Sequence, residues 1–463
     1  MSRVDAIFEP SSVILIGSSK MREKVGLSSP QLFRSVIHNM KEFFKGEICV
    51  RDVDGKEEQS IELLPKVPEL AVIMLPPEIS IVEAKKCARI GVKAFIMITG
   101  GYKDEQRREL VRLKEKYGVR ILGPNTVLGV INTTNGLNTT FEEDVMPKKG
   151  SIAVISQSGG VGACLLDWAC YYKIGISKFA FMGDKIDVDD IDLLRYLARD
   201  KETKVICLYM EGIKNGRKFI EEARKIIVKK PIVALKGGIT QESAHRAKSH
   251  TASMAGSDEI FDAAFKKAGI IRVEDPEELM NAAIALSKQP PMFGDNIAIV
   301  SNVGGPAILA ADAVARNSLK LARLSDDTKR KIESLYPGMD AANPIDMIAD
   351  ARAERYKEIL DLVLADKNVD GVLVINMLKS CFFEPEDAKV IPQVTAKYPK
   401  KPAVDVAAGG EDFELVYRVI GESNIPVYNL PEKGVKTLKI LRTYGKILEK
   451  MGKTQKNRGD YQF

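Results

Sequence analysis

One residue in this sequence stands out for the chemistry it could perform: His250, one of only three histidines in 463 residues. It lies in a run of small and polar residues, 237–256, without helical or strand periodicity, before a helix expected to begin at Ser257. A neutral imidazole is nucleophilic, and a phosphorylated ring nitrogen is a reactive donor. His250 is therefore a candidate phosphoryl carrier, with a structural loop histidine as the commoner alternative.

An acid that could orient this imidazole follows an apolar run. Glu211 comes directly after the strand predicted at 205–210 and precedes Gly212. Open α/β sheets bind ligands beyond the carboxyl ends of their strands, and a carboxylate there can accept a hydrogen bond from a ring N–H. A surface acid at the start of a loop is the alternative interpretation.

Two glycine-containing turns are candidates for binding the phosphoryl group. They are Ser156-Gln157-Ser158-Gly159-Gly160 and Asn302-Val303-Gly304-Gly305, each between a β-branched run and a helical stretch. The first turn of a helix concentrates free N–H groups and the positive end of the helix dipole. Glycine and serine also make tight turns that bind nothing, but two matched copies in one chain favour phosphate binding.

A third turn follows the first predicted strand: Gly17-Ser18-Ser19-Lys20. It lacks the GxGxxG spacing, since the next glycine is Gly26, so nicotinamide binding is disfavoured. Asp52 could still act as a ribose-binding acid, which leaves a nicotinamide oxidoreductase as an alternative. Lys20, with Arg22 and Lys24, would suit a ligand with several phosphates, or a solvated loop.

Parallel sheets with crossover helices are needed to position these turns. Short β-branched runs, each followed by a Gly/Ser turn and an amphipathic stretch, predict an α/β fold whose strands are buried on both faces. Examples of the predicted strands are 13–16, 71–75, 94–98, 152–155, 205–209, 232–235, 297–300 and 372–375. Breaks near 142–150 and 287–295 predict three domains, 1–141, 146–288 and 293–463, and the end beyond about 452 is expected to fray.

Composition narrows the classes of partner. The net charge of +6 is not gathered into a basic stripe, which argues against nucleic acid. The sequence shows neither a signal peptide nor an apolar run of roughly 20 residues, so a membrane protein is not expected. The six cysteines form no CxxC pair, which is typical of a reducing compartment, so a cytoplasmic location is expected.

Four sequence blocks resemble a known family. They are VISQSGGVGACLLDW from Val154, LYMEGIKNGRKF from Leu208, SHTASMAGSDEIFDAAFKKAGIIRV from Ser249 and NPIDMIADARAERY from Asn343. The chain resembles, over nearly its whole length, the α subunit of archaeal ADP-forming acetyl-CoA synthetases, relatives of succinyl-CoA synthetase. The resemblance implies a CoA-binding Rossmann-like domain, two flavodoxin-like ligase domains, and ATP-grasp domains on a separate β chain.

The resemblance also implies roles for particular residues. His250 would be phosphorylated, Glu211 would hold its ring, and the turns at 156–160 and 302–305 would bind the phosphohistidine or phosphate. The implied CoA contacts are Gly17, Ser18, Ser19, Lys20, Gly26, Pro76, Pro77, Thr99, Gly100, Pro124 and Asn125. The chain departs from the family pattern at Ser18, at Val50-Arg51-Asp52 and at Ala252-Ser253-Met254.

The implied reaction makes ATP from ADP and phosphate while an acyl-CoA is converted to the acid and CoA. Phosphohistidine would carry the phosphoryl group to a partner β subunit that binds the nucleotide with Mg²⁺, in an α2β2 heterotetramer, with no metal on this chain. The loop at 237–256 is expected to swing, because one side chain cannot span separate domains. A CoA sensor without turnover is the alternative.

Overall fold

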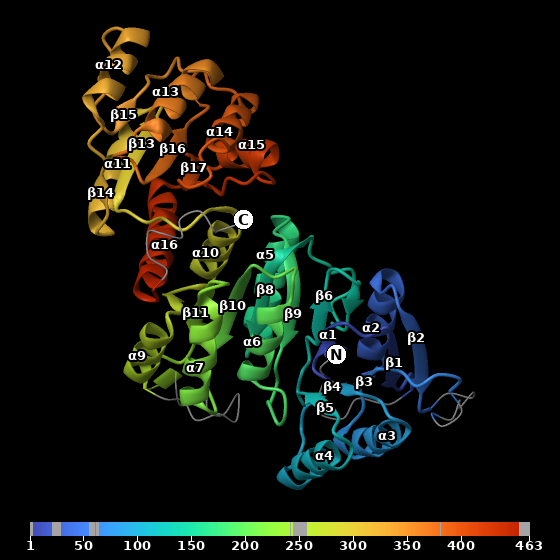
Figure 1. The fold of residues 1–463 in the computed structure, drawn as a ribbon. Helices are drawn as coiled ribbons and strands as arrows, with labels where there is room; N and C mark the ends of the chain where they lie inside the picture. Colours follow the sequence, from blue (N-terminus) through green and yellow to red (C-terminus); the bar gives the residue numbers. More distant parts are fainter. Residues whose placement is uncertain are drawn as a thin grey trace. The chain divides into compact units, whose positions relative to one another are not determined.

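The computed structural model describes residues 3–20, 29–54, 61, 64–240, 242–243, 257–379 and 381–452. The chain forms two compact units, Met1–Met280 and Asn281–Phe463. The first unit contains two sheets and the second unit contains one (Figure 1).

The first sheet consists of five parallel strands. They are β1 (Ser12–Gly17), β2 (Glu47–Asp52), β3 (Leu70–Ile73), β4 (Ala94–Met97) and β5 (Arg120–Leu122), in the order β2-β1-β3-β4-β5. Its helices are α1 (Asp5–Phe8), α2 (Pro30–Phe43), α3 (Pro77–Ile90) and α4 (Asp104–Tyr117). Pro30 and Pro77 occupy the first helical positions, where no N–H is needed. Helices α3 and α4 pack side by side over one face of the sheet (Figure 1).

The second sheet has seven strands in the order β12-β11-β10-β8-β9-β6-β7. They are β6 (Val130–Asn132), β7 (Leu137–Asn138), β8 (Lys149–Ser156), β9 (Ile176–Phe181), β10 (Val205–Met210), β11 (Ile232–Lys236) and β12 (Ile271–Val273). Its helices are α5 (Gly159–Tyr171), α6 (Asp190–Arg199), α7 (Gly216–Ile227), α9 (Asp258–Ala268) and α10 (Pro276–Lys288). Helix α7 packs between α6 and α9, so these three form one layer (Figure 1).

The third sheet runs β14-β13-β16-β17-β18, with β15 paired to β13. The strands are β13 (Asn296–Ser301), β14 (Lys320–Leu321), β15 (Ile345–Asp346), β16 (Gly371–Asn376), β17 (Ala403–Ala407) and β18 (Val427–Tyr428). The helical elements are α11 (Gly304–Arg316), α12 (Asp326–Leu335), α13 (Ala353–Ala365), η2 (Pro385–Lys389), α14 (Val390–Thr395), α15 (Glu411–Ile420) and α16 (Pro431–Lys450). Helices α11 and α16 pack together (Figure 1).

All three sheets share one strand order. If the parallel strands of each sheet are numbered along the chain, with β15 of the third sheet left aside, the order is 2-1-3-4-5. In such a sheet the connections from strand 1 and strand 3 leave in opposite directions, which opens a crevice at their carboxyl ends. The turns after β1, β8 and β13 and the loops after β3, β10 and β16 therefore mark three candidate ligand positions.

Each strand predicted from the sequence is present, and its ends agree to within two residues, except that β8 begins at Lys149, three residues before the predicted start. The central strands are buried on both faces, as continuous apolar runs require. Other observed strands, such as β5, β9 and β17, were not among the examples predicted. An antiparallel element was also not expected: β6 and β7 form a short hairpin, and β6 joins β9 in antiparallel orientation. Residues 130–138 thus belong to the second sheet, although the sequence placed them in the first domain; the domain boundaries stay a prediction.

The chain shows no sign of a membrane span in the part that the structure describes, where every helix is too short or too polar to cross a bilayer. All six cysteines are free, and Cys87 and Cys207 are fully buried. Burial raises the pKa of the Cys207 thiol to about 12, so this side chain behaves as a small apolar residue.

A buried acid lies inside the third sheet. Asp405, in β17, is 0% exposed, and its Oδ1 accepts a hydrogen bond of 2.7 Å from Asn376 Nδ2 at the end of β16. Among the described residues, neither Asp405 Oδ2 nor Asn376 Oδ1 has a partner. Burial raises the pKa of Asp405 to about 7, although the hydrogen bond from Asn376 lowers it. The neutral acid is the form that this environment favours.

Asp405 should make the stability of the protein depend on pH. Its native pKa of about 7 lies above the ordinary value of 3.8, so the native state keeps a proton that the unfolded state releases as the pH rises. Relative to Asp405→Asn, the wild type should lose roughly 2 to 4 kcal/mol of stability between about pH 4 and pH 7, and no more above that. Urea unfolding of both proteins at several pH values measures this difference, and a difference that stays constant would contradict the assignment.

Candidate functional site

The turn after β8 is built around two serines. Ser156 is fully buried; its Oγ donates to Ser158 O at 2.6 Å and accepts from Ser158 N at 3.2 Å. Ser158 is the N-cap of α5, and its Oγ accepts from Val161 N at 3.4 Å. These bonds turn the chain sharply from strand into helix. Gly159 and Gly160 are the first two residues of α5, and a Cβ on Gly160 would meet no atom within 4 Å.

The side chain of Gln157 is buried and makes its hydrogen bonds within the protein. It is 3% exposed, and its Oε1 accepts hydrogen bonds from Glu211 N at 2.8 Å and Gly212 N at 3.0 Å. Its Nε2 donates to Gly212 O at 3.0 Å and to Asp190 Oδ1 at 2.6 Å. The side chain therefore connects the turn after β8 to the loop after β10. If this turn binds an anion, Gln157 can contribute only through its backbone.

Glu211 lies at the carboxyl end of the second sheet, as predicted from its place after a buried strand. It is 6% exposed, and Oε1 accepts a hydrogen bond of 3.3 Å from Tyr209 Oη. Burial, followed by the neighbouring Glu211 charge, raises the pKa of Tyr209 to about 12, so Tyr209 stays a neutral donor. Glu211 and the turn at 156–160 are thus brought together through Gln157.

Three further residues at this end of the sheet were not singled out in the sequence. Lys185 and Asp190 form an ion pair of 3.1 Å, with side chains 2% and 5% exposed. Lys236 ends β11, where the loop at 237–256 begins, and its Nζ lies 4.7 Å from the centre of the Phe261 ring. Burial lowers the pKa of Lys236, while Asp258 and Glu211 act against that shift. The sequence analysis could have identified Lys236, because it is a lysine at the end of an apolar strand.

The turn after β13 repeats the geometry of the turn after β8. Ser301 Oγ donates to Val303 O at 2.7 Å and accepts from Val303 N at 3.1 Å. Asn302 is fully buried; its Nδ2 donates to Met377 O at 2.9 Å, and its Oδ1 accepts from Met377 N at 3.0 Å. Gly304 and Gly305 begin α11, as Gly159 and Gly160 begin α5. The match seen in the sequence is therefore a match in structure.

The two repeated folds differ where the chemistry is expected. Met377 stands where the second sheet has Glu211, next to the buried amide of the turn. The connection after β17 is short, since α15 begins at Glu411, whereas the connection after β11 spans residues 237–257 before α9. Only the first unit combines an acid at this position with a long loop that carries a histidine.

The turn after β1 is tightly built. A Cβ on Gly17 would lie 2.2 Å from Phe33, so only glycine fits there. Ser18 is 4% exposed and donates to Asp54, and Ser19 N donates to Asp52 Oδ1 at 3.1 Å. Asp52 therefore holds the turn itself. Partial burial acts to raise the pKa of Asp52, but the hydrogen bonds from Ser19 and from Asp54 N lower it overall. Lys20 is exposed, and its Nζ donates to Asp54 O at 3.2 Å.

The other residues implied in CoA binding lie on neighbouring loops of the first sheet. Pro76 is the N-cap of α3 and Pro77 its first residue, and Thr99 Oγ1 donates to Leu75 O at 2.6 Å. Asn125 N donates to Thr99 O at 2.9 Å, and Asn125 Oδ1 lies 2.8 Å from the position of a Cβ on Gly100. Pro124 follows Gly123 in a cis peptide. These residues therefore gather at the carboxyl ends of β3, β4 and β5.

Several predicted residues lie outside the described part of the chain: Gly26, Arg22, Lys24 and His250. The helix expected at Ser257 is confirmed, because Ser257 is the N-cap of α9 and Asp258 and Glu259 occupy its first turn. The loop that carries His250 is thus bounded by the described Lys236 and Ser257.

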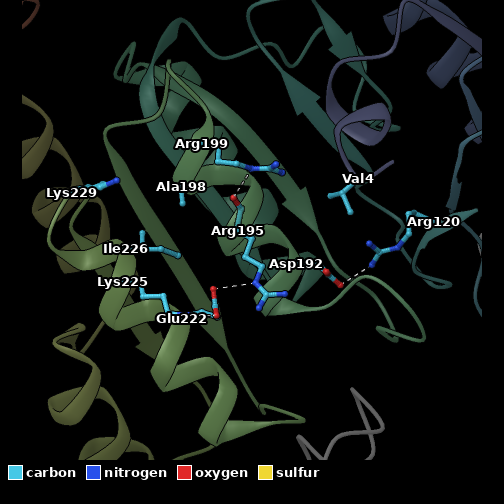
Figure 2. Close-up of a pocket in the computed structure, with 10 residues that line it drawn as sticks. All are labelled: Val4, Arg120, Asp192, Arg195, Ala198, Arg199, Glu222, Lys225, Ile226 and Lys229. Carbon is cyan, nitrogen blue, oxygen red and sulfur yellow. Dashed lines mark hydrogen bonds and ion pairs between the residues drawn. The ribbon is translucent and has the colours of Figure 1, made fainter. Parts of the chain in front are cut away.

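A pocket of about 540 Å³ lies elsewhere in the first unit (Figure 2). It is lined by Val4, Arg120, Asp192, Arg195, Ala198, Arg199, Glu222, Lys225, Ile226 and Lys229. Its cations are largely paired: Arg195 with Glu222 at 3.1 Å, and Arg120 with Asp192 at 2.8 Å (Figure 2). Hydrogen bonds from Arg195 and Lys225 lower the pKa of Glu222 to about 2. The pocket contains none of the predicted site residues.

Comparisons with known proteins cover the whole of this architecture. Models of a CoA binding domain, a succinyl-CoA ligase like flavodoxin domain and a ligase-CoA domain match residues 12–132, 149–286 and 297–444. The chain is 37% identical to the α subunit of acetate–CoA ligase [ADP-forming] II of Pyrococcus furiosus, over 93% of this chain and 95% of the relative. It is 35% identical to acetate–CoA ligase [ADP-forming] I of Archaeoglobus fulgidus, over 96% of this chain but 64% of that relative.

A solved structure is similar over nearly the full length. It is the dinucleotide forming acetyl-coenzyme A synthetase 1 of Ca. Korarchaeum cryptofilum in complex with phosphate and ADP. The TM-score is 0.87, with 29% identity over 98% of this chain and 99% of that one. The predicted α/β class with helix-flanked parallel sheets is confirmed.

Glycine to alanine substitutions should show whether Gly160 and Gly305 serve only the turns or also an anion-binding site. A Cβ on Gly160 or Gly305 would meet nothing within 4 Å. Gly160→Ala and Gly305→Ala should therefore keep or raise stability, by up to about 1 kcal/mol. If an anion approaches these amides, each methyl group should weaken binding of inorganic phosphate by roughly tenfold, or about 1.4 kcal/mol. Calorimetric titration of the full chain with phosphate measures the affinity.

Gly216→Ala is the matched control. Gly216 begins α7, also with nothing within 4 Å of a Cβ, but lies in neither turn. It should leave phosphate affinity unchanged. Unaltered affinity in Gly160→Ala and Gly305→Ala as well would mean that these glycines serve only the turns.

Proposed function

This chain belongs to the family of the α subunits of ADP-forming acetate–CoA ligases, and on that premise we propose that it converts acyl-CoA, ADP and phosphate to the acid, ATP and CoA. A CoA sensor without turnover is not favoured, because relatives that match over nearly the whole chain are named ligases. The family resemblance inferred from four sequence blocks is thereby confirmed.

The first step of the proposed reaction forms an acyl phosphate. An oxygen of inorganic phosphate attacks the thioester carbonyl, the C–S bond breaks, and CoA leaves as a thiolate that takes up a proton. Backbone N–H groups of the turn at 156–160 would bind the phosphate, as helix N-termini bind anions generally. Because this cradle is neutral, phosphate can bind and leave without being trapped by a strong ion pair.

The second step moves the phosphoryl group to His250. A neutral ring nitrogen attacks phosphorus, the bond from phosphorus to the acyl oxygen breaks, and the acid leaves as a carboxylate. Glu211 would accept the N–H of the other ring nitrogen, which fixes the tautomer and stabilises the positive ring in the transition state. Positioning and electrostatic stabilisation are the main contributions expected for such a transfer.

The third step delivers the phosphoryl group to ADP on a partner subunit. A β-phosphate oxygen of ADP attacks the phosphorus, and the P–N bond breaks to restore the imidazole. We place the nucleotide and its Mg²⁺ on an ATP-grasp β subunit, in an α2β2 heterotetramer and in the cytoplasm. The name of the Pyrococcus furiosus relative, an α subunit of which this chain covers 95%, supports the existence of a partner subunit.

One observation carries the proposal: a buried amide holds Glu211 against a strand-to-helix turn in the unit that carries the His250 loop. The Gln157 hydrogen bonds to Glu211 N and Gly212 N are 2.8 and 3.0 Å long. The equivalent amide in the third sheet holds Met377. The connection after β17, which corresponds to the loop that carries His250, is short. The same scaffold thus serves without an acid in the second unit, so the acid in the first unit is not required by the fold.

We place CoA on the first sheet. Gly17, Ser18, Ser19, Lys20 and Gly26 would surround the phosphates, and the loops with Pro76, Pro77, Thr99, Gly100, Pro124 and Asn125 would hold the remainder. Support comes from the position of the described residues among these at the carboxyl ends of β1, β3, β4 and β5.

Ligand-induced stabilisation should distinguish CoA from a nicotinamide. CoA at about 100 times its Kd should stabilise the chain by roughly 2.7 kcal/mol, whereas NAD should leave the melting temperature unchanged. Differential scanning fluorimetry of the full chain with each ligand measures this. A shift with NAD and none with CoA would contradict the CoA assignment.

His250→Ala should abolish phosphorylation of the chain. Incubation of the full chain with acetyl phosphate should give an acid-labile phosphoryl adduct in the wild type, because a phosphorylated imidazole nitrogen is lost in acid. Glu211→Gln should slow its formation on the order of 100-fold, since the ring loses its charged partner. Phosphate release after acid treatment, with intact-mass analysis, measures the adduct.

His245→Ala is the matched control, because it removes a histidine from the same loop. It should be phosphorylated like the wild type. Persistence of the adduct in His250→Ala, or its loss in His245→Ala alone, would refute the assignment of the carrier.

A further inference from the structure

A buried ion pair lies beside the loop that carries Glu211. Lys185 Nζ and Asp190 Oδ2 are 3.1 Å apart, with side chains 2% and 5% exposed. Lys185 also has a φ of 53°, a left-handed conformation that is unfavourable for a residue other than glycine. A buried ion pair is stable only if further hydrogen bonds satisfy it. The hydrogen-bond partners of Lys185 and Asp190 therefore indicate which groups the ion pair positions.

Those partners all belong to the turn and the loop at the carboxyl end of the second sheet. Lys185 Nζ donates to Gly212 O at 3.0 Å, and Asp190 Oδ1 accepts from Gln157 Nε2 at 2.6 Å. Asp190 thereby fixes which end of the Gln157 amide is nitrogen. The oxygen end must then face Glu211 N and Gly212 N, where it accepts both hydrogen bonds.

The segment that carries the ion pair also rests on the first sheet. Asp184 N donates to Pro124 O at 2.8 Å, and Asp184 Oδ2 lies 2.8 Å from Arg107. Asp187 Oδ2 accepts from Arg120 Nε at 2.9 Å. Gly183 is packed so closely that a Cβ would lie 2.1 Å from Pro124 O. Residues 183–190 are therefore held on both sides within the first unit.

We propose that Gln157 is a positioning residue for Glu211, and that the Lys185–Asp190 pair holds Gln157 in the orientation this requires. The inference rests on the proposed function, because it assigns Glu211 to the phosphorylation of His250. It gives Gln157 a different part from the phosphate contact implied by the family resemblance. With Oε1 and Nε2 each making two hydrogen bonds inside the protein, the side chain acts on Glu211 and not on the phosphate.

The test is a double-mutant cycle on the rate of His250 phosphorylation by acetyl phosphate, measured on the full chain. Gln157→Met should slow the reaction roughly 10- to 100-fold, as a displacement of a catalytic group by about 1 Å does. In a Glu211→Gln background, the same substitution should have almost no further effect, because the group it positions is already disabled. A residue that merely stabilises the fold would not lose its effect in this way.

Gln289→Met is the matched control. Gln289 is 5% exposed and also bridges two backbone groups, through Asn424 O at 2.6 Å and Ala403 N at 2.8 Å. It should lower stability as Gln157→Met does and leave the phosphorylation rate unchanged. If Gln157→Met does not fold, the Lys185→Met/Asp190→Asn variant replaces it in the cycle, since it removes both buried charges together.

The outcomes separate the inference from the proposed function. An equal loss of rate in both backgrounds, or no loss in either, overturns the positioning role while phosphorylation of His250 in the wild type stands. Absence of the adduct from the wild type overturns the proposed function and, with it, the role of Gln157.

Discussion

The structure depends on how backbone groups are satisfied where parallel strands end. Strand pairing stops at the carboxyl edge of each sheet, and a buried N–H or C=O group without a partner is costly there. In the second and third sheets a buried amide side chain meets this requirement: Gln157 binds the backbone of Glu211 and Gly212, and Asn302 binds both groups of Met377. Each amide joins the turn after strand 1 to the loop after strand 3, across the crevice where such sheets bind ligands.

The same constraint explains why two similar folds can differ in function. The amide clamp fixes backbone positions, so the side chain on the clamped loop can change without loss of the scaffold. In the first unit that side chain is Glu211, and the connection after β11 carries a histidine at 250; in the second unit it is Met377, and α15 follows β17 closely. A fixed frame with variable side chains on its loops is how many folds acquire their chemistry.

The buried charged side chains discussed above also have polar partners. Lys185 and Asp190 are paired and also bonded to the clamp, so their burial orients other groups. Arg51 and Glu83 form a comparable buried pair at the end of β2, 2.8 Å apart. For Asp405, burial raises the pKa and so favours the neutral form, while the hydrogen bond from Asn376 opposes this shift.

The sequence by itself determined eight of the strands, the α/β class, the strand-to-helix turns and the position of Glu211 at a strand end, because these depend on local hydrophobic runs and turn residues. Its motifs also pointed to the family. Only the tertiary structure decided the common strand order, the antiparallel β6–β7 hairpin and the inward use of Gln157. It also decided the buried pairing of Lys185 with Asp190, because each of these depends on which distant segments lie side by side. A glutamine in a glycine-rich turn has the same local signature whether it faces a ligand or the protein interior; the neighbours that settle this are 33 to 55 residues away.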